Sequence, residues 1–192
     1  MTSKLEDNFA KTLPQKKEFV NPLDVIKQTH LGPNMIVADL GCGSGYLSFA
    51  AAKIINPEGL VYAVDIRTEA ISSIESQKRL FGERNIKTLR ADLSEKKSTG
   101  LSSGSVDLVI LATIVFQLPD KKSLFEEAKR IVKDKGEIVI LDWKKKDSPI
   151  GPPVRERISQ KSMERLLTEE NLVVTRNIVS DPYHYGFLTH KG

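Results

Sequence analysis

One short segment holds residue types that could bind a nucleoside-bearing ligand. The segment V-A-D-L-G-C-G-S-G, residues 37–45, is an apolar strand that runs into a turn with three glycines. Twenty residues past this turn, the apolar segment 60–64 ends in Asp65. Glycines let the backbone pass close beneath a ligand, and a carboxylate at the tip of the next strand can accept hydrogen bonds from ribose hydroxyls. The pattern therefore predicts a site for a nucleoside-containing cofactor.

The spacing of the glycines favours one class of cofactor over another. Dinucleotide-binding turns use G-x-G-x-x-G or a final alanine, because the third small residue lets the helix pack against the strand. Here Tyr46 occupies that third position, and the last glycine is Gly45. With Asp39 ahead of Gly41 and Gly43, the run reads D-x-G-x-G-x-G, which resembles motif I of the class I S-adenosylmethionine-dependent methyltransferases. A dinucleotide-dependent oxidoreductase is an alternative, and Tyr46 argues against it.

The resemblance implies S-adenosylmethionine as the cofactor and S-adenosylhomocysteine as its product. In that family Asp39 would orient the methionine amino group, and Asp65 would accept the ribose hydroxyls. Ile66 would pack on the adenine, Asp92 would accept a hydrogen bond from its amino group, and Cys42 would be a small buried filler rather than a nucleophile. The residues expected at the cofactor are Asp39, Gly41, Cys42, Gly43, Gly45, Asp65, Ile66, Ala91, Asp92, Leu93 and Ala112.

A methyl acceptor would need a general base if it is a phenol or an amine, because such a group must lose a proton. Candidates lie near the ends of the last predicted strands: His184, Tyr183, Tyr185 and Asp142. Alternation along a strand places Tyr183 and Tyr185 on one face and His184 on the other. The alternative for each is ordinary packing in a half-exposed strand.

Aromatic and basic residues follow the fifth predicted strand, on the acceptor side. Trp143 would either line the acceptor pocket or only cover the sheet. The lysines at 144–146 and the arginines Arg155 and Arg157 suggest an anionic acceptor that an arginine grips. A solvated run of charge is the alternative.

Hydrophobic periodicity predicts five strand–helix alternations and a closing hairpin. Strands are expected near 35–40, 60–65, 86–90, 106–111 and 137–141, and in the hairpin at 172–179 and 183–189. Such alternation requires a parallel sheet with right-handed crossovers, and the short link between the last two strands makes them antiparallel. The resemblance implies a Rossmann-like α/β fold with seven strands in the order 3-2-1-4-5-7-6.

The sequence also marks where helices begin and end. Asn21, Asp120 and Ser159 are expected to cap helices, and two further helices are expected at 46–55 and 68–81. Gly82 suits the C-terminal cap of the helix 68–81, whose buried residues are predicted to be Ile71, Ile74 and Phe81.

The length of 192 residues suits a single domain. The resemblance implies that this is a methyltransferase domain over 1–192, with an N-terminal helical segment, 1–34, and a Rossmann-like core, 35–192. The net charge of +4 makes nucleic acid an unlikely partner, and one cysteine with three dispersed histidines predicts no metal site. No apolar run reaches the length of a membrane span, and a cytoplasmic location is expected.

The acceptor class follows from what the motifs lack. Residues 112–116, A-T-I-V-F, stand where many base- or glutamine-methylating relatives carry an N-P-P-Y type motif. The chain therefore resembles the type 11, quinone-biosynthesis-like branch, whose acceptors are small molecules. The alternatives are an RNA or protein methyltransferase and a non-catalytic S-adenosylmethionine-binding protein.

Overall fold

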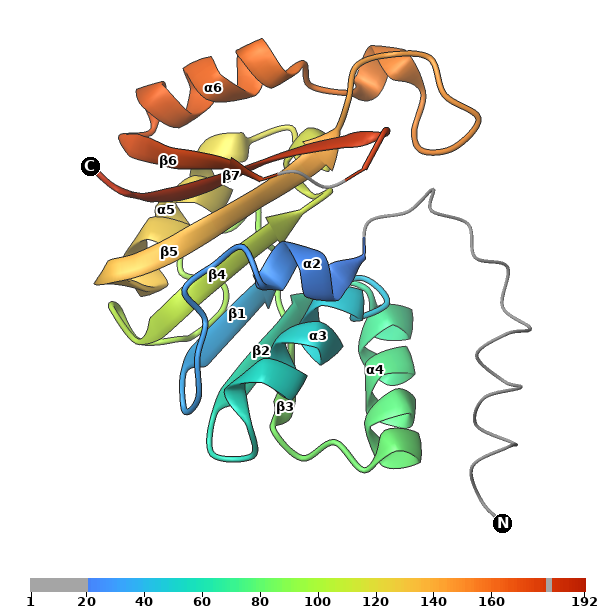
Figure 1. Cartoon of the computed structure of the whole chain (residues 1–192), viewed down its shortest axis with the longest axis vertical. Helices are drawn as coiled ribbons and strands as arrows, with labels where there is room; N and C mark the ends of the chain where they lie inside the picture. Colours follow the sequence, from blue (N-terminus) through green and yellow to red (C-terminus); the bar gives the residue numbers. More distant parts are fainter. Residues whose placement is uncertain (1–20, 179–180) are drawn as a thin grey trace.

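The computed structural model describes residues 21–178 and 181–192, and its described strands form one seven-stranded mixed sheet in the order β3-β2-β1-β4-β5-β7-β6 (Figure 1). The first five strands are parallel, and β7 runs antiparallel to both β5 and β6. This is the predicted fold and strand order. The strands are β1 (Ile36–Leu40), β2 (Leu60–Asp65), β3 (Ile86–Arg90), β4 (Val106–Ala112), β5 (Val132–Trp143), β6 (Leu172–Ile178) and β7 (His184–Lys191).

Side-chain caps begin three of the described helices, and a glycine ends a fourth. They are α2 (Pro22–Ile26), α3 (Tyr46–Ile55), α4 (Thr68–Phe81), α5 (Lys121–Ile131) and α6 (Gln160–Glu169), with short 3₁₀ turns η1 (Val115–Gln117) and η2 (Val154–Glu156). The side chains of Asn21, Asp120 and Ser159 accept backbone N–H groups in the first turns of α2, α5 and α6. Gly82 ends α4 in the left-handed conformation, with φ of 70°. All four caps confirm the sequence prediction.

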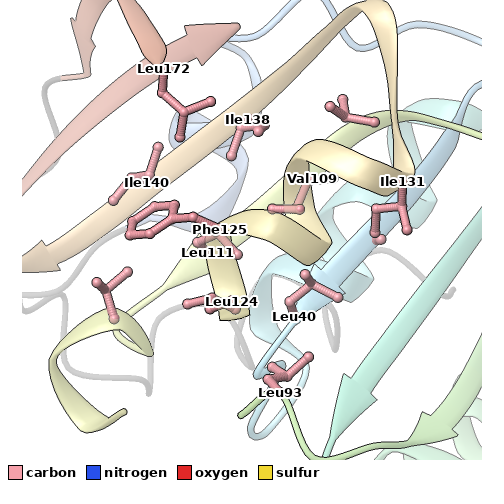
Figure 2. Packing of buried hydrophobic residues seen from close by; sticks show 14 of the residues in the cluster. Leu40, Leu93, Val109, Leu111, Leu124, Phe125, Ile131, Ile138, Ile140 and Leu172 are labelled. Carbon is pink, nitrogen blue, oxygen red and sulfur yellow. The ribbon is translucent and has the colours of Figure 1, made fainter. Parts of the chain in front are cut away.

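Two apolar layers cover the sheet. α5 and α6 pack on one face, where Leu124, Phe125 and Ile131 of α5 meet the side chains of β4 and β5 (Figure 2). α2, α3 and α4 cover the other face (Figure 1). Because side chains alternate along a strand, Ile140 of β5 joins the α5 layer and Leu141 joins the α3 layer. The same alternation decides which residues at the strand ends reach the site.

Several predictions about the elements were wrong or only partly right. Ile71 of α4, which was expected to be buried, is half-buried. Phe81, which was also expected to be buried, is 63% exposed. α4 packs on the sheet through Ala70 and Ile74, and Phe81 lies at its C-terminal end. The Phe81 ring contacts the Phe49 ring edge-on, with 6.0 Å between the ring centroids. β5 begins at Val132 rather than at 137, because a register shift lets Val132 already pair with β4.

None of the described helices is long and apolar enough to cross a membrane. Residues 1–20, and with them most of the expected N-terminal segment, lie outside the described residues.

Candidate functional site

A cavity of about 580 Å³ opens at the carboxyl ends of the parallel strands. It lies where β1 and β4 are neighbours and the strand order reverses, which is where open α/β sheets bind ligands. The start of α2, the turn after β1, the ends of β4 and β5 and the start of β7 all contribute. The lining residues are Pro22, Asp39, Gly41, Cys42, Gly43, Ser44, Tyr46, Leu47, Ala112, Thr113, Leu141, Trp143 and His184.

The turn after β1 can be made only by glycine at its key positions. Gly41 and Gly45 have φ of 78° and 84°, which side-chain-bearing residues rarely adopt. A Cβ on Gly41 would also lie 2.7 Å from the Ile114 side chain. The amides of Gly41 and Cys42 donate to the Val64 carbonyl and tie the turn to β2. The turn therefore presents bare backbone to the cavity in a fixed shape.

Asp39 places a carboxyl group at the base of this turn. Its side chain is 2% exposed and accepts a 2.6 Å hydrogen bond from the Ser48 hydroxyl. Burial raises the pKa of Asp39 to about 6, and the hydrogen bonds from Ser48 only partly offset that rise. A cationic group in the cavity would favour the ionised carboxylate, so the site suits an ammonium ligand.

Asp65 ends β2 and is held by four hydrogen bonds. The Gly43 amide donates to one oxygen at 2.9 Å, and the Arg67 amide donates to the other at 2.9 Å. The Arg67 guanidinium adds bonds of 3.1 and 3.3 Å. Burial alone would raise the pKa of Asp65, but the bonds from Arg67 and Gly43 outweigh it and hold the pKa below its ordinary value. Since Arg67 is 64% exposed, a ribose diol could replace its guanidinium.

The residues expected around the adenine lie at the ends of β2 and β3, outside the cavity lining. Ile66 is 48% exposed and presents an apolar surface, while Ala91 and Leu93 are buried. One Asp92 oxygen accepts both the hydroxyl and the amide of Ser94, which lowers the pKa of Asp92. This is the bonding of a turn residue.

Cys42 lines the cavity but has no nucleophilic character. Burial raises the pKa of its thiol far above the ordinary value, and the nearby carboxylates of Asp39 and Asp65 raise it further. Nucleophilic cysteines need the opposite shift. Among the described residues, no group of three or more histidines, cysteines or acids could hold a metal ion.

Trp143 and His184 line the cavity from the ends of β5 and β7. Their ring centroids lie 4.0 Å apart, at the paired ends of β5 and β7. Gly151 packs closely against the Trp143 ring, since a Cβ added to Gly151 would lie 2.7 Å from ring atoms. Nδ1 of His184 lies 2.8 Å from a carboxylate oxygen of Asp181. Sequence reasoning treated Asp181 only as part of the link between strands; an acid three residues before a histidine at a strand start was the available signal.

The other general-base candidates do not line the cavity. Asp142 is fully buried on the α5 side, where burial raises its pKa to about 7 and one oxygen accepts the Trp143 amide at 2.7 Å. Among the described residues, its other oxygen has no hydrogen-bond partner. The hydroxyl of Tyr185, in the same layer, donates to the Ile158 carbonyl. Tyr183 is half-buried, and its amide donates to Asp181.

The two arginines proposed for an anionic acceptor have different surroundings. Arg157 is 3% exposed, and its guanidinium makes five hydrogen bonds within the loop 144–157. Their acceptors are the carbonyls of Lys144, Lys146, Ile150 and Pro152 and the hydroxyl of Ser148. Arg157 therefore holds the loop in place rather than gripping a ligand, which corrects the sequence prediction. Arg155 is 83% exposed and pairs with Glu156.

A family of methyltransferase domains matches residues 31–183. The chain belongs to this family. It is 29% identical over 110 residues to an arsenite methyltransferase of Aquipseudomonas alcaligenes, and 26% identical over 112 residues to a demethylmenaquinone methyltransferase of Lactobacillus johnsonii. These matches cover 55% and 58% of this chain but only 32% and 45% of the relatives.

Solved structures agree with the family. A SAM-dependent methyltransferase from Aquifex aeolicus matches with a TM-score of 0.83 and 26% identity, covering 96% of each chain. The chain is thus a class I methyltransferase domain, and S-adenosylmethionine is the cofactor of its family. The residues present fit that cofactor: a bare glycine turn, a buried acid for an ammonium and an acid at the tip of β2.

Proposed function

We propose that this domain transfers a methyl group from S-adenosylmethionine to a small-molecule acceptor bound against Trp143 and His184. The observation that carries the proposal is one cavity shared by the glycine turn and by these two rings. Its volume of about 580 Å³ lies within the range of small-ligand sites, roughly 300–1,000 Å³. The similarity to a demethylmenaquinone methyltransferase supports an acceptor of the small-molecule branch.

Each side of the cavity would hold one reactant. Asp39 would pair with the amino group of the cofactor, and the turn from Gly41 to Ser44 would follow its amino-acid tail. Asp65 is not one of the lining residues but is bonded to the amide of the lining residue Gly43, and it would hold the ribose. Bound S-adenosylmethionine would supply a methyl group on a sulfonium, and the acceptor would attack the methyl carbon in line while the thioether of S-adenosylhomocysteine leaves. The protein contributes alignment and exclusion of water, and ideal positioning can supply about 7–11 kcal/mol.

The acceptor of the arsenite-methylating relative does not suit this site. Arsenic(III) is a soft centre for which thiolates are the matching ligands. The chain contains one cysteine, and burial holds the Cys42 thiol protonated. An oxygen, nitrogen or carbon nucleophile fits the cavity better. The structure gives Arg157 no part in binding an anion, so we do not require an anionic acceptor.

Calorimetry with S-adenosylhomocysteine tests the cofactor half of the proposal. We expect binding by the wild type and about 10- to 100-fold weaker binding by Asp65→Asn, because a hydrogen bond to a charged group contributes about 1.5–3 kcal/mol. Asp134→Asn is the matched control, since Asp134 is 98% exposed at the opposite end of the sheet. Binding of NAD in place of S-adenosylhomocysteine would refute the proposal.

Transfer itself is measured with isotopically labelled cofactor and a panel of phenols, alcohols, amines and thiols. We expect at least one acceptor to take up label. Binding of S-adenosylhomocysteine without any transfer would instead support a non-catalytic binding protein.

A further inference from the structure

Asp181 and His184 form a buried acid–imidazole pair at the edge of the cavity. Their side chains are 3% and 5% exposed, and Nδ1 of His184 lies 2.8 Å from Oδ2 of Asp181. The other Asp181 oxygen accepts the backbone amides of Tyr183 and His184 at 2.6 and 2.7 Å. The carboxylate is thereby fixed against the imidazole, and His184 itself lines the cavity.

The surrounding loop holds this pair in place from the β5 side. Nζ of Lys144 donates to the Asp181 carbonyl at 2.8 Å, and the Lys144 amide donates to the Tyr183 carbonyl at 2.7 Å. The Trp143 ring contacts the imidazole, with 4.0 Å between the ring centroids and a tilt of 46° between the ring planes. A carboxylate at Nδ1 makes that nitrogen the N–H donor of the neutral ring, so the basic lone pair belongs to Nε2.

We propose that His184, oriented by Asp181, is the general base that takes a proton from the methyl acceptor, and that the acceptor is a hydroxyl group or a neutral amine that keeps its O–H or N–H proton at neutral pH. The inference rests on the proposed methyl transfer. As the acceptor's oxygen or nitrogen forms its bond to the methyl carbon, Nε2 accepts the acceptor's proton. The carbon–sulfur bond breaks and its electron pair stays on sulfur. Asp181 then stabilises the imidazolium.

The charges around His184 suit a base at neutral pH. Burial lowers the pKa of His184, and the cations Lys144 and Arg157 lower it further, while Asp181 partly offsets both. The ring is therefore neutral at pH 7 and able to accept a proton. A hydroxyl or amine acceptor needs this help, whereas a thiol that ionises readily needs it less.

Kinetics of two variants test the assignment with the acceptor panel of phenols, alcohols, amines and thiols. For a hydroxyl or amine acceptor, His184→Gln should lower kcat by about 10²–10⁴-fold with the affinity for S-adenosylhomocysteine unchanged. Asp181→Asn should lower kcat less. It should also move the acidic limb of the kcat–pH profile to lower pH, because removing the carboxylate removes the group that raises the pKa of His184.

A nuclear magnetic resonance measurement needs no acceptor. Nitrogen–proton correlation spectra of the imidazoles should show His184 with its proton on Nδ1 and a pKa below 6.5, and the Asp181→Asn variant should lose the Nδ1–H preference. A proton on Nε2 at pH 7, or a kcat that survives His184→Gln, would overturn the base assignment alone. Transfer confined to thiols would do the same. No transfer by the wild type would remove the proposed function together with this inference.

Discussion

The two sides of the cavity are built in different ways. On the cofactor side, nine consecutive residues, 37–45, supply the strand, the turn and the acid, and the turn is anchored by backbone bonds to its neighbour β2. On the proposed acceptor side, Trp143, Arg157, Asp181 and His184 come from separate segments and are joined by side-chain hydrogen bonds and a tilted ring contact. Local backbone constraints therefore shape one half, and tertiary contacts shape the other.

The comparison is tested most strongly by Gly41→Val. Strain at a φ of 78° costs about 1–3 kcal/mol, and the close approach to Ile114 at 2.7 Å adds a similar overpacking cost. We expect S-adenosylhomocysteine binding to weaken by about 100-fold or more, because the turn must shift, as measured by calorimetry.

The control for Gly41→Val is Gly82→Ala. Gly82 has a φ of 70°, but a Cβ there would meet nothing within 4 Å. It should cost about 1 kcal/mol or somewhat more in unfolding free energy and leave cofactor affinity unchanged. Equal loss of cofactor affinity in both variants would contradict the claim that cofactor binding depends on the shape of the turn at Gly41.

Replacing Arg157 should destabilise the proposed acceptor side. Arg157→Lys keeps the charge but has three donors for five acceptors, so at least two of these part-buried hydrogen bonds are lost. We expect about 2–4 kcal/mol lower unfolding free energy by denaturant titration, from about 1 kcal/mol for each lost bond. Acceptor turnover should fall while S-adenosylhomocysteine affinity changes little.

Arg155→Lys is the matched control, since Arg155 is 83% exposed and, in the part of the chain that the structure describes, forms an ion pair with its neighbour Glu156. Its unfolding free energy should stay within about 0.5 kcal/mol of the wild type. A rise in acceptor KM for Arg155→Ala, with stability unchanged, would restore the anionic acceptor that the sequence suggested.

This contrast explains what the sequence could and could not predict. The caps at Asn21, Asp120 and Ser159 were predicted correctly because each acts on its own first helical turn. Arg157 was misjudged because its acceptors become neighbours only when the loop folds back. Phe81 lay on the predicted apolar stripe, but periodicity does not reveal where a helix runs beyond the layer that it covers.

Asp39 allows a test by pH on the cofactor side. Its carboxyl has a pKa of about 6 in the folded state against 3.8 in the unfolded state, so between these values the folded chain binds more protons. Folding stability from this group is therefore lost as pH rises from about 4 to about 6, by up to about 3 kcal/mol. Asp39→Asn should lack this loss in the absence of cofactor, so its unfolding free energy relative to the wild type should rise over that interval.

The outcome of the Asp39 experiment separates burial from other causes. Denaturant titrations at pH 4, 5, 6 and 7 supply the measurement. Asp134→Asn, at a 98% exposed position, should show no such increase. A constant difference between Asp39→Asn and the wild type across the four pH values would mean that burial does not raise the pKa of Asp39.

The smallest expected effect concerns the Arg67 side chain. Its guanidinium occupies Asp65 oxygens that the ribose is proposed to use, and with Gly43 and its own amide it fills roughly the four lone-pair directions of a carboxylate. Asp65 is buried but the Arg67 side chain is 64% exposed, so we assign their ion pair about 0.2–1 kcal/mol, which is lost when the ribose replaces the guanidinium. Arg67→Ala should therefore bind S-adenosylhomocysteine up to about fivefold more tightly by calorimetry.

The affinity of Arg67→Lys, which keeps the charge without the planar fork, should fall between those of Arg67→Ala and the wild type. Weaker binding by Arg67→Ala would instead make Arg67 part of the cofactor site, and the cofactor half would then depend, like the acceptor half, on a side chain that the glycine motif does not include.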